Sequence, residues 1–123
     1  MSKCILIVDD SQSIRAVTRH YLESQPRFEV CGEAVDGLDA LDKARDLRPD
    51  LIIMDLEMPR MNGFQTARAM RTRNVSAPII LFTIYADAVR WQDAQAAGLS
   101  AVVSKSDLST LQQEIDRLLL ANN

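Results

Sequence analysis

Five short apolar runs recur along this chain, and most of them are followed directly by a polar side chain. The runs are Cys4 to Val8, Phe28 to Ala34, Leu51 to Met54, Ile79 to Phe82 and Ala101 to Ser104. Amphipathic stretches of helical periodicity separate them, and this alternation favours a parallel sheet joined by right-handed helical crossovers. We therefore predict an α/β fold, a doubly wound (βα)5 arrangement around one five-stranded parallel sheet.

Five amphipathic helices are expected between and after these strands. Ser11 or Ser13 caps the first, Asp36 opens the second and Asp107 caps the last. The fourth is expected to run from Asp87 to Ala97, with Gly98 ending it. The faces expected to pack on the sheet are Ile14, Val17, Tyr21 and Leu22 in the first helix, Leu38, Leu41, Ala44 and Leu47 in the second, Phe64, Ala67 and Met70 in the third, and Leu108, Leu111, Ile115, Leu118 and Leu119 in the last.

The polar side chains at the strand ends indicate a binding site. Asp9 and Asp10 follow the first strand, Asp55 the third, Thr83 the fourth and Lys105 the fifth. In an open parallel sheet, ligands bind outside the carboxyl ends of the strands, so these side chains should converge. Clustered carboxylates favour a hard cation such as Mg²⁺, and an ammonium and a hydroxyl beside that cation suit a phosphoryl group.

The composition narrows the class of protein further. With 123 residues and 47% hydrophobic content, the chain is expected to form a single soluble domain over residues 1–123. Its net charge of −3 and the lack of a basic run argue against nucleic-acid binding. No apolar stretch is long enough for a membrane span and no signal peptide is recognisable, which predicts a cytoplasmic protein. Cys4 and Cys31 are accordingly expected to be two buried, reduced thiols.

The segment around Asp55 carries a resemblance to a known family. It reads Met54-Asp55-Leu56-Glu57-Met58-Pro59-Arg60-Met61-Asn62-Gly63. Together with the acid pair, the threonine and the lysine at their strand ends, it resembles the receiver domain of bacterial two-component response regulators. The single-domain chemotaxis regulators are the most similar architecture. The resemblance covers essentially the whole chain and implies a flavodoxin-like fold with strand order 2-1-3-4-5.

The resemblance also implies a role for each site residue. Asp55 would be the phosphoacceptor, with Thr83 and Lys105 contacting the phosphoryl oxygens. The Mg²⁺ ligands would be Asp9, Asp10 and Asp55 with the backbone carbonyl of Glu57, Asp9 acting mainly through water or by orienting the site. The phosphodonor would be a phosphohistidine on a sensor histidine kinase or a histidine phosphotransfer protein. Phosphorylation would switch the surface of helix 4, strand 5 and helix 5 for an unknown downstream protein, in a monomer or weak dimer.

The chain departs from the family pattern at several positions, and two of them lie close to the lysine. Many members carry Tyr or Phe three residues before the lysine, as a rotameric switch, whereas this chain has Val102. The residue after the lysine is commonly a proline in a cis peptide, and here it is Ser106. The Lys105–Ser106 bond is therefore expected to be trans, because a cis bond before a residue other than proline costs about 2.5–4 kcal/mol. Trp91 is expected on the output surface, midway along the fourth helix.

Four other functions remain open at this stage. The chain could be the receiver part of a longer transcriptional regulator. An aspartyl-phosphate phosphatase would carry a second Asp where this chain has Glu57. A pseudo-receiver that docks partners without phosphorylation would not need all five site residues. A flavin-binding protein of the same topology would carry a loop rich in Ser, Thr and Gly after the first strand. The expected role is therefore a signalling domain, which is not an enzyme beyond its own phosphorylation and dephosphorylation.

Overall fold

A computed structural model describes residues 2–120 of the chain. Met1 and residues 121–123 lie outside the described residues. The strands are β1 (Lys3–Val8), β2 (Phe28–Ala34), β3 (Leu51–Met54), β4 (Ile79–Thr83) and β5 (Ala101–Ser104). They form one sheet of order β2-β1-β3-β4-β5 in which every pair of neighbours is parallel. The predicted fold class and the strand order implied by the resemblance are confirmed.

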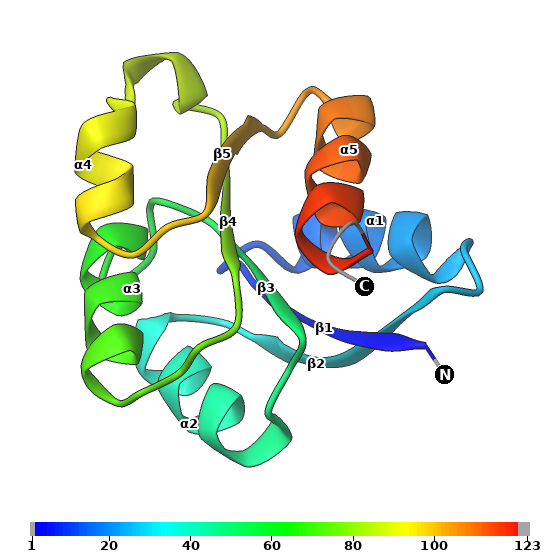
Figure 1. The fold of residues 1–123 in the computed structure, drawn as a ribbon, viewed down its shortest axis with the longest axis horizontal. Helices are drawn as coiled ribbons and strands as arrows, with labels where there is room; N and C mark the ends of the chain where they lie inside the picture. The colour runs from blue at the N-terminus through cyan, green and yellow to red at the C-terminus, as the bar shows by residue number, and fades with distance from the viewer. Residues whose placement is uncertain (1, 121–123) are drawn as a thin grey trace.

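Helices cover both faces of this sheet (Figure 1). Their bounds are α1 (Gln12–Glu23), α2 (Gly37–Leu47), α3 (Gly63–Thr72), α4 (Trp91–Ala96) and α5 (Leu108–Leu119). Helices α1 and α5 lie on one face, and α2, α3 and α4 lie on the other. Because successive side chains of a strand point to opposite faces, β1 gives Ile5 and Ile7 to the α1/α5 core, and Leu6 and Val8 to the α2/α3/α4 core.

The buried faces of α1 and α2 differ from the predicted ones. In α1, Val17 is exposed, and Thr18 is buried instead because its hydroxyl donates to the Ile14 carbonyl at 2.8 Å. In α2, Leu38 and Leu47 are exposed, and the buried face comprises Gly37, Ala40, Leu41 and Ala44. Small residues on that face let the helix approach its neighbours closely. A Cβ at Gly37 would lie only 2.4 Å from the Thr66 hydroxyl of α3.

The helix predicted from Asp87 to Ala97 is broken near its start. Ala86–Ala88 form one 3₁₀ turn, Val89 and Arg90 are extended, and α4 begins only at Trp91. Val89 packs its side chain against the α2/α3/α4 core. This tertiary contact outweighs the helical preference of the segment. Trp91 is therefore the first residue of α4 rather than a residue midway along it.

The expectation of two reduced cysteines is wrong in this structure, because Cys4 and Cys31 form a disulfide. The parallel register pairs Ile5 with Val30 but Leu6 with Gly32, so Cys31 is the extra residue of a β-bulge in β2. The Cα atoms of the two cysteines are 5.4 Å apart, within the usual range for a disulfide. The bond joins the start of β1 to the edge strand of the sheet, far along β1 from Asp9.

Among residues 2–120, the structure contains no helix that is both long enough and apolar enough to cross a bilayer.

Candidate functional site

Three carboxylates meet at the carboxyl edge of the sheet. Asp9 and Asp10 follow β1, and Asp55 follows β3, its neighbour in the sheet. Asp9 is 3% exposed and Asp55 8% exposed, whereas Asp10 is open to solvent. One carboxylate oxygen from each of the three lies within 4.8 Å of the others. The neighbouring strands β1 and β3 thus bring together acids that are 45 residues apart in the sequence.

Lys105 provides the positive charge of this cluster. Its Nζ lies 2.7 Å from Asp9 Oδ2 and 3.3 Å from Asp55 Oδ1, and only 12% of its side chain is exposed. Its backbone N–H donates to the Thr83 carbonyl at 3.0 Å, which fixes the β5 end beside the β4 end. The ammonium of Lys105, which follows β5, therefore contacts both buried carboxylates.

The cluster changes the proton affinity of its members. Burial raises the pKa of Asp55, and the nearby charge of Asp9 raises it further, while Lys105 and the Leu56 N–H oppose the shift. For Lys105, burial alone would lower the pKa. The hydrogen bond to Asp9 and the charges of Asp55 and Asp9 outweigh burial, so its pKa is raised. Lys105 is thus held as a cation, whereas Asp55 sits among negative charge that a divalent cation would offset.

A pocket of about 620 Å³ opens over these groups. Asp10, Asp55 and Lys105 form its polar floor, and the exposed Tyr85 stands at its wall. Glu57 also lines the pocket, although its side chain is outside the carboxylate trio. The remaining lining residues are Met58, Pro59, Asn62 and Ile84. The pocket is large enough to hold a small ligand beside Asp55.

Thr83 lies beside this pocket rather than in its wall. Its side chain is fully buried, and its hydroxyl oxygen accepts from the Tyr85 N–H at 3.0 Å. This hydrogen bond leaves the hydroxyl proton free to be donated elsewhere. The Lys105–Ser106 peptide bond is trans, as predicted, because the described residues contain no cis peptide. Val102 is half-buried and packs on the α2/α3/α4 core.

The loop after β3 depends on a glycine. The Gly63 N–H donates to the Leu56 carbonyl at 2.7 Å, which closes the loop directly behind Asp55. A Cβ at Gly63 would lie 2.6 Å from the Asp55 carbonyl oxygen and 2.7 Å from a Leu81 methyl group. Only glycine allows this close approach. The next helix, α3, is capped by Asn62, whose side chain accepts from the Gln65 N–H while the Gln65 side chain accepts from the Asn62 N–H.

One buried arginine that sequence reasoning missed supports the acid pair. Arg15 Nη1 donates to the Asp9 carbonyl at 2.7 Å, and its Nε donates to Glu33 at 2.8 Å. Arg19 also donates to Glu33, at 2.7 Å, but within residues 2–120 its side chain makes no hydrogen bond to the acid loop. Burial would raise the pKa of Glu33, but the bonds from Arg19 and Arg15 outweigh it and hold that pKa below its usual value. In the sequence, Arg15 is just one more charge on a helix.

Asp36 opens α2, as predicted, and it also takes part in an ion pair that the sequence did not indicate. It is 6% exposed, caps α2 by accepting from the Asp39 N–H, and pairs with Arg60 at 2.7 Å. Arg60 has a φ of 73°, in the left-handed region. The ion pair joins the loop after Asp55 to the start of α2, so it helps to hold the wall of the pocket.

Known proteins are similar to this chain in both sequence and fold. The family model described as the response regulator receiver domain matches residues 5–116. A protein-glutamate methylesterase/protein-glutamine glutaminase of Nocardioides sp. is 45% identical over 103 residues, which are 82% of this chain and 28% of the relative. A protein of the same description from Alkalilimnicola ehrlichii is 38% identical over 93% of this chain and 30% of its own length. The chain thus spans less than a third of these relatives.

Solved structures agree with the sequence relatives. The response regulator domain of Thermotoga maritima CheB superposes with a TM-score of 0.89 at 27% identity, covering 97% of both chains. The response regulator TrrA from the same organism, solved in complex with Mg²⁺-BeF, has a TM-score of 0.85 at 32% identity and covers 95% of this chain and 99% of its own. With a family model that matches nearly all of the described residues, this chain belongs to the response regulator receiver domain family.

Proposed function

We propose that this receiver takes a phosphoryl group onto Asp55 from a phosphohistidine of a sensor histidine kinase or a histidine phosphotransfer protein. The observation that carries the proposal is the position of Asp55. It is a nearly buried carboxylate at the floor of an open pocket, 3.3 Å from the Lys105 ammonium and within a trio of acids. A carboxylate oxygen of Asp55 forms the new bond to phosphorus as the bond from phosphorus to the donor imidazole breaks. The electron pair of that bond stays on the imidazole nitrogen.

The acid trio suits Mg²⁺, which prefers hard oxygen ligands. Asp9, Asp10, Asp55 and the Glu57 carbonyl would hold the ion, which when bound would neutralise charge on the transferring group. Lys105 is placed to pair with a phosphoryl oxygen once Asp55 carries the group. The Thr83 hydroxyl would then donate to another oxygen. Phosphoryl transfer requires mainly positioning and charge neutralisation, and this set of groups supplies both.

Labelling by a small phosphodonor tests the proposal directly. Incubation with acetyl phosphate and Mg²⁺ should raise the intact mass by one phosphoryl group, and peptide mapping should place that group on Asp55. Chelation of Mg²⁺ by EDTA should suppress the increase. A protein that gains no mass under these conditions would instead be a docking pseudo-receiver.

The support of the acid loop by Arg15 leads to a prediction about Mg²⁺ affinity. Arg15→Ala should weaken Mg²⁺ binding about tenfold, because residues that orient metal ligands contribute on that scale. Arg19→Ala is the matched control. It removes a partner of the same Glu33 without touching the Asp9 carbonyl, so it should change the affinity no more than about twofold. Titration calorimetry on folded proteins measures both, and equal weakening by the two variants would count against the role of Arg15.

The output surface is proposed to comprise α4, β5 and α5. Trp91 at the start of α4 is 47% exposed, and it borders a hollow of about 320 Å³ with Val102 of β5 and with Glu114 and Arg117 of α5. An exposed tryptophan beside such a hollow suits a protein interface. Because Val102 stands in place of an aromatic residue, a movement of Thr83 would have to reach α4 through Ile84 and Tyr85. The Tyr85 N–H already donates to the Thr83 hydroxyl.

Trp91 should report this switch by its fluorescence. Phosphorylation of the wild-type protein should change the emission intensity or maximum, because the environment of the indole changes with α4. The Asp55→Asn protein, treated in the same way, should show no change. An identical spectrum before and after complete phosphorylation of the wild type would place the output on another face.

A second candidate function comes from the sequence relatives. Several are protein-glutamate methylesterases/protein-glutamine glutaminases, of which this chain matches only 21–32% of the length. We propose that, if the chain is part of a longer protein, a methylesterase is favoured over the transcriptional regulator. The reading frame after codon 123 distinguishes the two, because a following sequence related to methylesterases supports the first and a DNA-binding domain supports the second. A stop codon directly after codon 123 would leave the single-domain receiver.

A further inference from the structure

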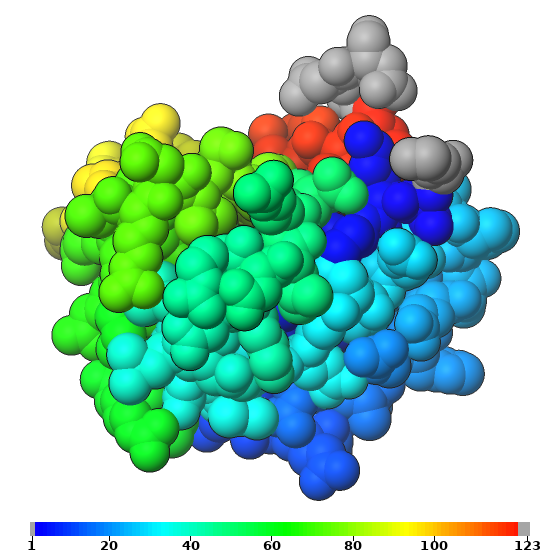
Figure 2. All heavy atoms as spheres, turned by 90° about the horizontal axis from the view of Figure 1, so that it is seen from below, coloured from blue at the N-terminus to red at the C-terminus, as the bar shows by residue number. Residues whose placement is uncertain are grey.

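A groove with an apolar floor and a cationic rim lies at the end of the sheet opposite to the acid trio. It has a volume of about 640 Å³ and is formed by the C-terminal half of α2 and the connection from α3 to β4. Seen from below, α2 lies beside α3 and this connection on the surface (Figure 2). Pockets of this size hold small ligands rather than single ions. The lining residues precede β3 and β4, whereas Asp55 and Thr83 follow or end these strands, so the two sites are separate.

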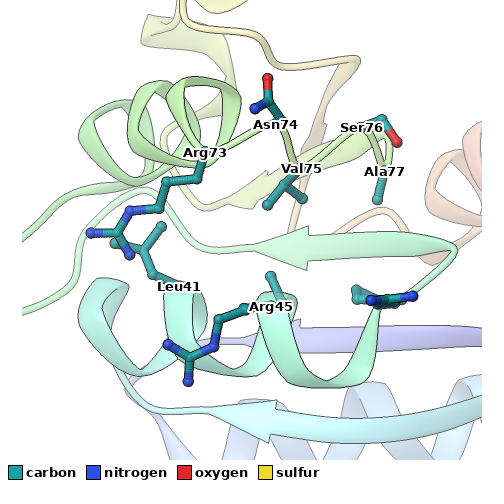
Figure 3. A pocket seen from close by; sticks show the side chains of 10 residues that line it. Leu41, Arg45, Arg73, Asn74, Val75, Ser76 and Ala77 are labelled. Carbon is teal, nitrogen blue, oxygen red and sulfur yellow. The ribbon is translucent and has the colours of Figure 1, made fainter.

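The walls of the groove are apolar where α2 and the connection face each other. Leu41 and Ala44 of α2 are buried beneath it, and Val75 and Ala77 point from the connection toward α2 (Figure 3). The carbonyls of Val75 and Ala77 accept from Arg71 Nη1 at 2.6 and 2.9 Å. Because these backbone acceptors are satisfied by Arg71, they do not make this wall negative. Such walls suit a flat, apolar ring.

The rim carries guanidinium groups that have no partner within the described part of the chain. Arg48 and Arg73 both line the groove and are exposed, and within residues 2–120 their side chains make no hydrogen bond or ion pair. Arg73 extends across the groove toward Leu41 (Figure 3). Arg45 also lines the rim, but it already pairs with Asp46 at 2.8 Å. Two guanidinium groups without a partner in residues 2–120 therefore line one groove, in a chain whose net charge is −3.

The number of free donors points to phosphate rather than carboxylate. Each guanidinium offers a planar fork that binds two oxygens. A single carboxylate has only two oxygens and would satisfy one fork, whereas a chain of phosphates can satisfy both. An apolar cleft of this volume beside the forks has room for a base. We propose that the groove binds a nucleoside polyphosphate, with its phosphates on Arg48 and Arg73 and its base between Leu41 and Val75.

A rival explanation is that these arginines serve only the helix ends. Arg48 and Arg73 are the C-terminal caps of α2 and α3, where a cation offsets the negative end of the helix dipole. That role predicts a loss of thermal stability when either charge is removed. It also predicts that the wild-type protein does not bind nucleotide. The two explanations therefore differ in one measurement, the affinity of the folded wild-type protein for nucleotide.

The test is binding of ATP and of GTP to the wild-type chain, measured by calorimetry in EDTA so that no metal-dependent phosphate site forms. We expect at least one of them to bind with a Kd below about 1 mM, at least tenfold tighter than tripolyphosphate or the nucleoside alone. In ¹⁵N-resolved NMR spectra, the amides of residues 41–48 and 73–77 should shift. Shifts centred on Asp55 and Lys105 instead, or equal affinity for tripolyphosphate, would overturn the proposal.

Variants then locate the contacts. Arg48→Asn keeps a residue that tolerates the left-handed φ of 48° found there, and Arg73→Ala removes the second fork. Each should weaken nucleotide binding about tenfold or more. Arg68→Ala and Arg90→Ala remove exposed arginines outside the groove and should leave the affinity within about twofold. If all four variants weaken binding equally, the interaction is general charge attraction and the groove is not a site. Absence of binding to the wild type overturns the proposal outright.

Discussion

Asp55→Asn is expected to abolish phosphorylation by acetyl phosphate while leaving the protein folded. The amide cannot supply the nucleophilic oxygen anion. Within residues 2–120, Asp55 is the acid that both lines the pocket and pairs with Lys105, at 3.3 Å. The expected result is no gain of mass under conditions that label the wild type fully. Asp42→Asn, a change of the same kind on the exposed face of α2, should be labelled as the wild type is.

The same substitution should stabilise the metal-free protein. A variant that is more stable but is not phosphorylated has lost the reacting group and not its fold. Burial and the charge of Asp9 raise the pKa of Asp55, so its ionised form opposes folding near neutral pH. Removing that charge should therefore raise the free energy of unfolding at pH 7. Lys105 remains paired with Asp9 at 2.7 Å in the variant.

The pH dependence of this stabilisation has a definite sign. The unfavourable contribution of ionised Asp55 is fully present above its raised folded pKa. It fades as the pH falls through that value, and it is gone below the ordinary pKa of an aspartate. The difference in melting temperature between variant and wild type should therefore stay constant well above that folded pKa and shrink as the pH falls through it toward the ordinary pKa of an aspartate. A variant that is less stable than the wild type at pH 7, without metal, would contradict this electrostatic account.

The sequence was sufficient to predict the sheet and the convergence of its polar ends. Four of the strands are short apolar runs with a polar side chain at or directly after their end, and parallel strands bring their carboxyl ends to one edge whatever lies between them. For this reason Asp9 and Asp55 could be placed together from local patterns alone. Their exact contacts, such as the bond from Lys105 to Asp9 rather than mainly to Asp55, depend on side-chain geometry that no pattern encodes.

Features that depend on packing between elements could not be predicted in the same way. Val89 breaks the expected fourth helix because its side chain reaches the core, a contact that local propensity does not contain. Arg15 acts on the Asp9 carbonyl through a long side chain from the next helix. The predicted buried faces of α1 and α2 were wrong for two different reasons. In α1, Thr18 is buried because its hydroxyl bonds its own helix. In α2, a close helix contact at Gly37 takes the place of larger apolar residues.

The disulfide between Cys4 and Cys31 could not be predicted either, because it depends on a register shift. The bulge in β2 places Cys31 between the residues that pair with Ile5 and Leu6, and so beside Cys4. A separation of 27 residues in the sequence does not by itself indicate that two cysteines lie close together in the fold. Both residues are half-buried, which leaves the bond within reach of a small reductant.

Removal of this disulfide is expected to have the largest effect on stability. A cross-link that closes a loop of this length lowers the entropy of the unfolded chain, which corresponds to about 3–4 kcal/mol at 25 °C. The Cys4→Ala/Cys31→Ala protein should therefore unfold at a melting temperature roughly 10–15 °C below that of the oxidised wild type. Urea denaturation with and without a phosphine reductant measures the same quantity in the wild-type protein.

The double variant serves as the control for the reductant, since its denaturation midpoint should be the same with and without it. Labelling at Asp55 should continue in both reduced wild type and double variant, because the bond lies at the start of β1 and the acid site at its opposite end. A wild-type midpoint that does not move on reduction would show that the cross-link contributes nothing. A loss of labelling together with retained folding would show that the cross-link affects the acid site at the opposite end of β1. In that case the bond to the edge strand would couple the redox state of the protein to the phosphoacceptor site.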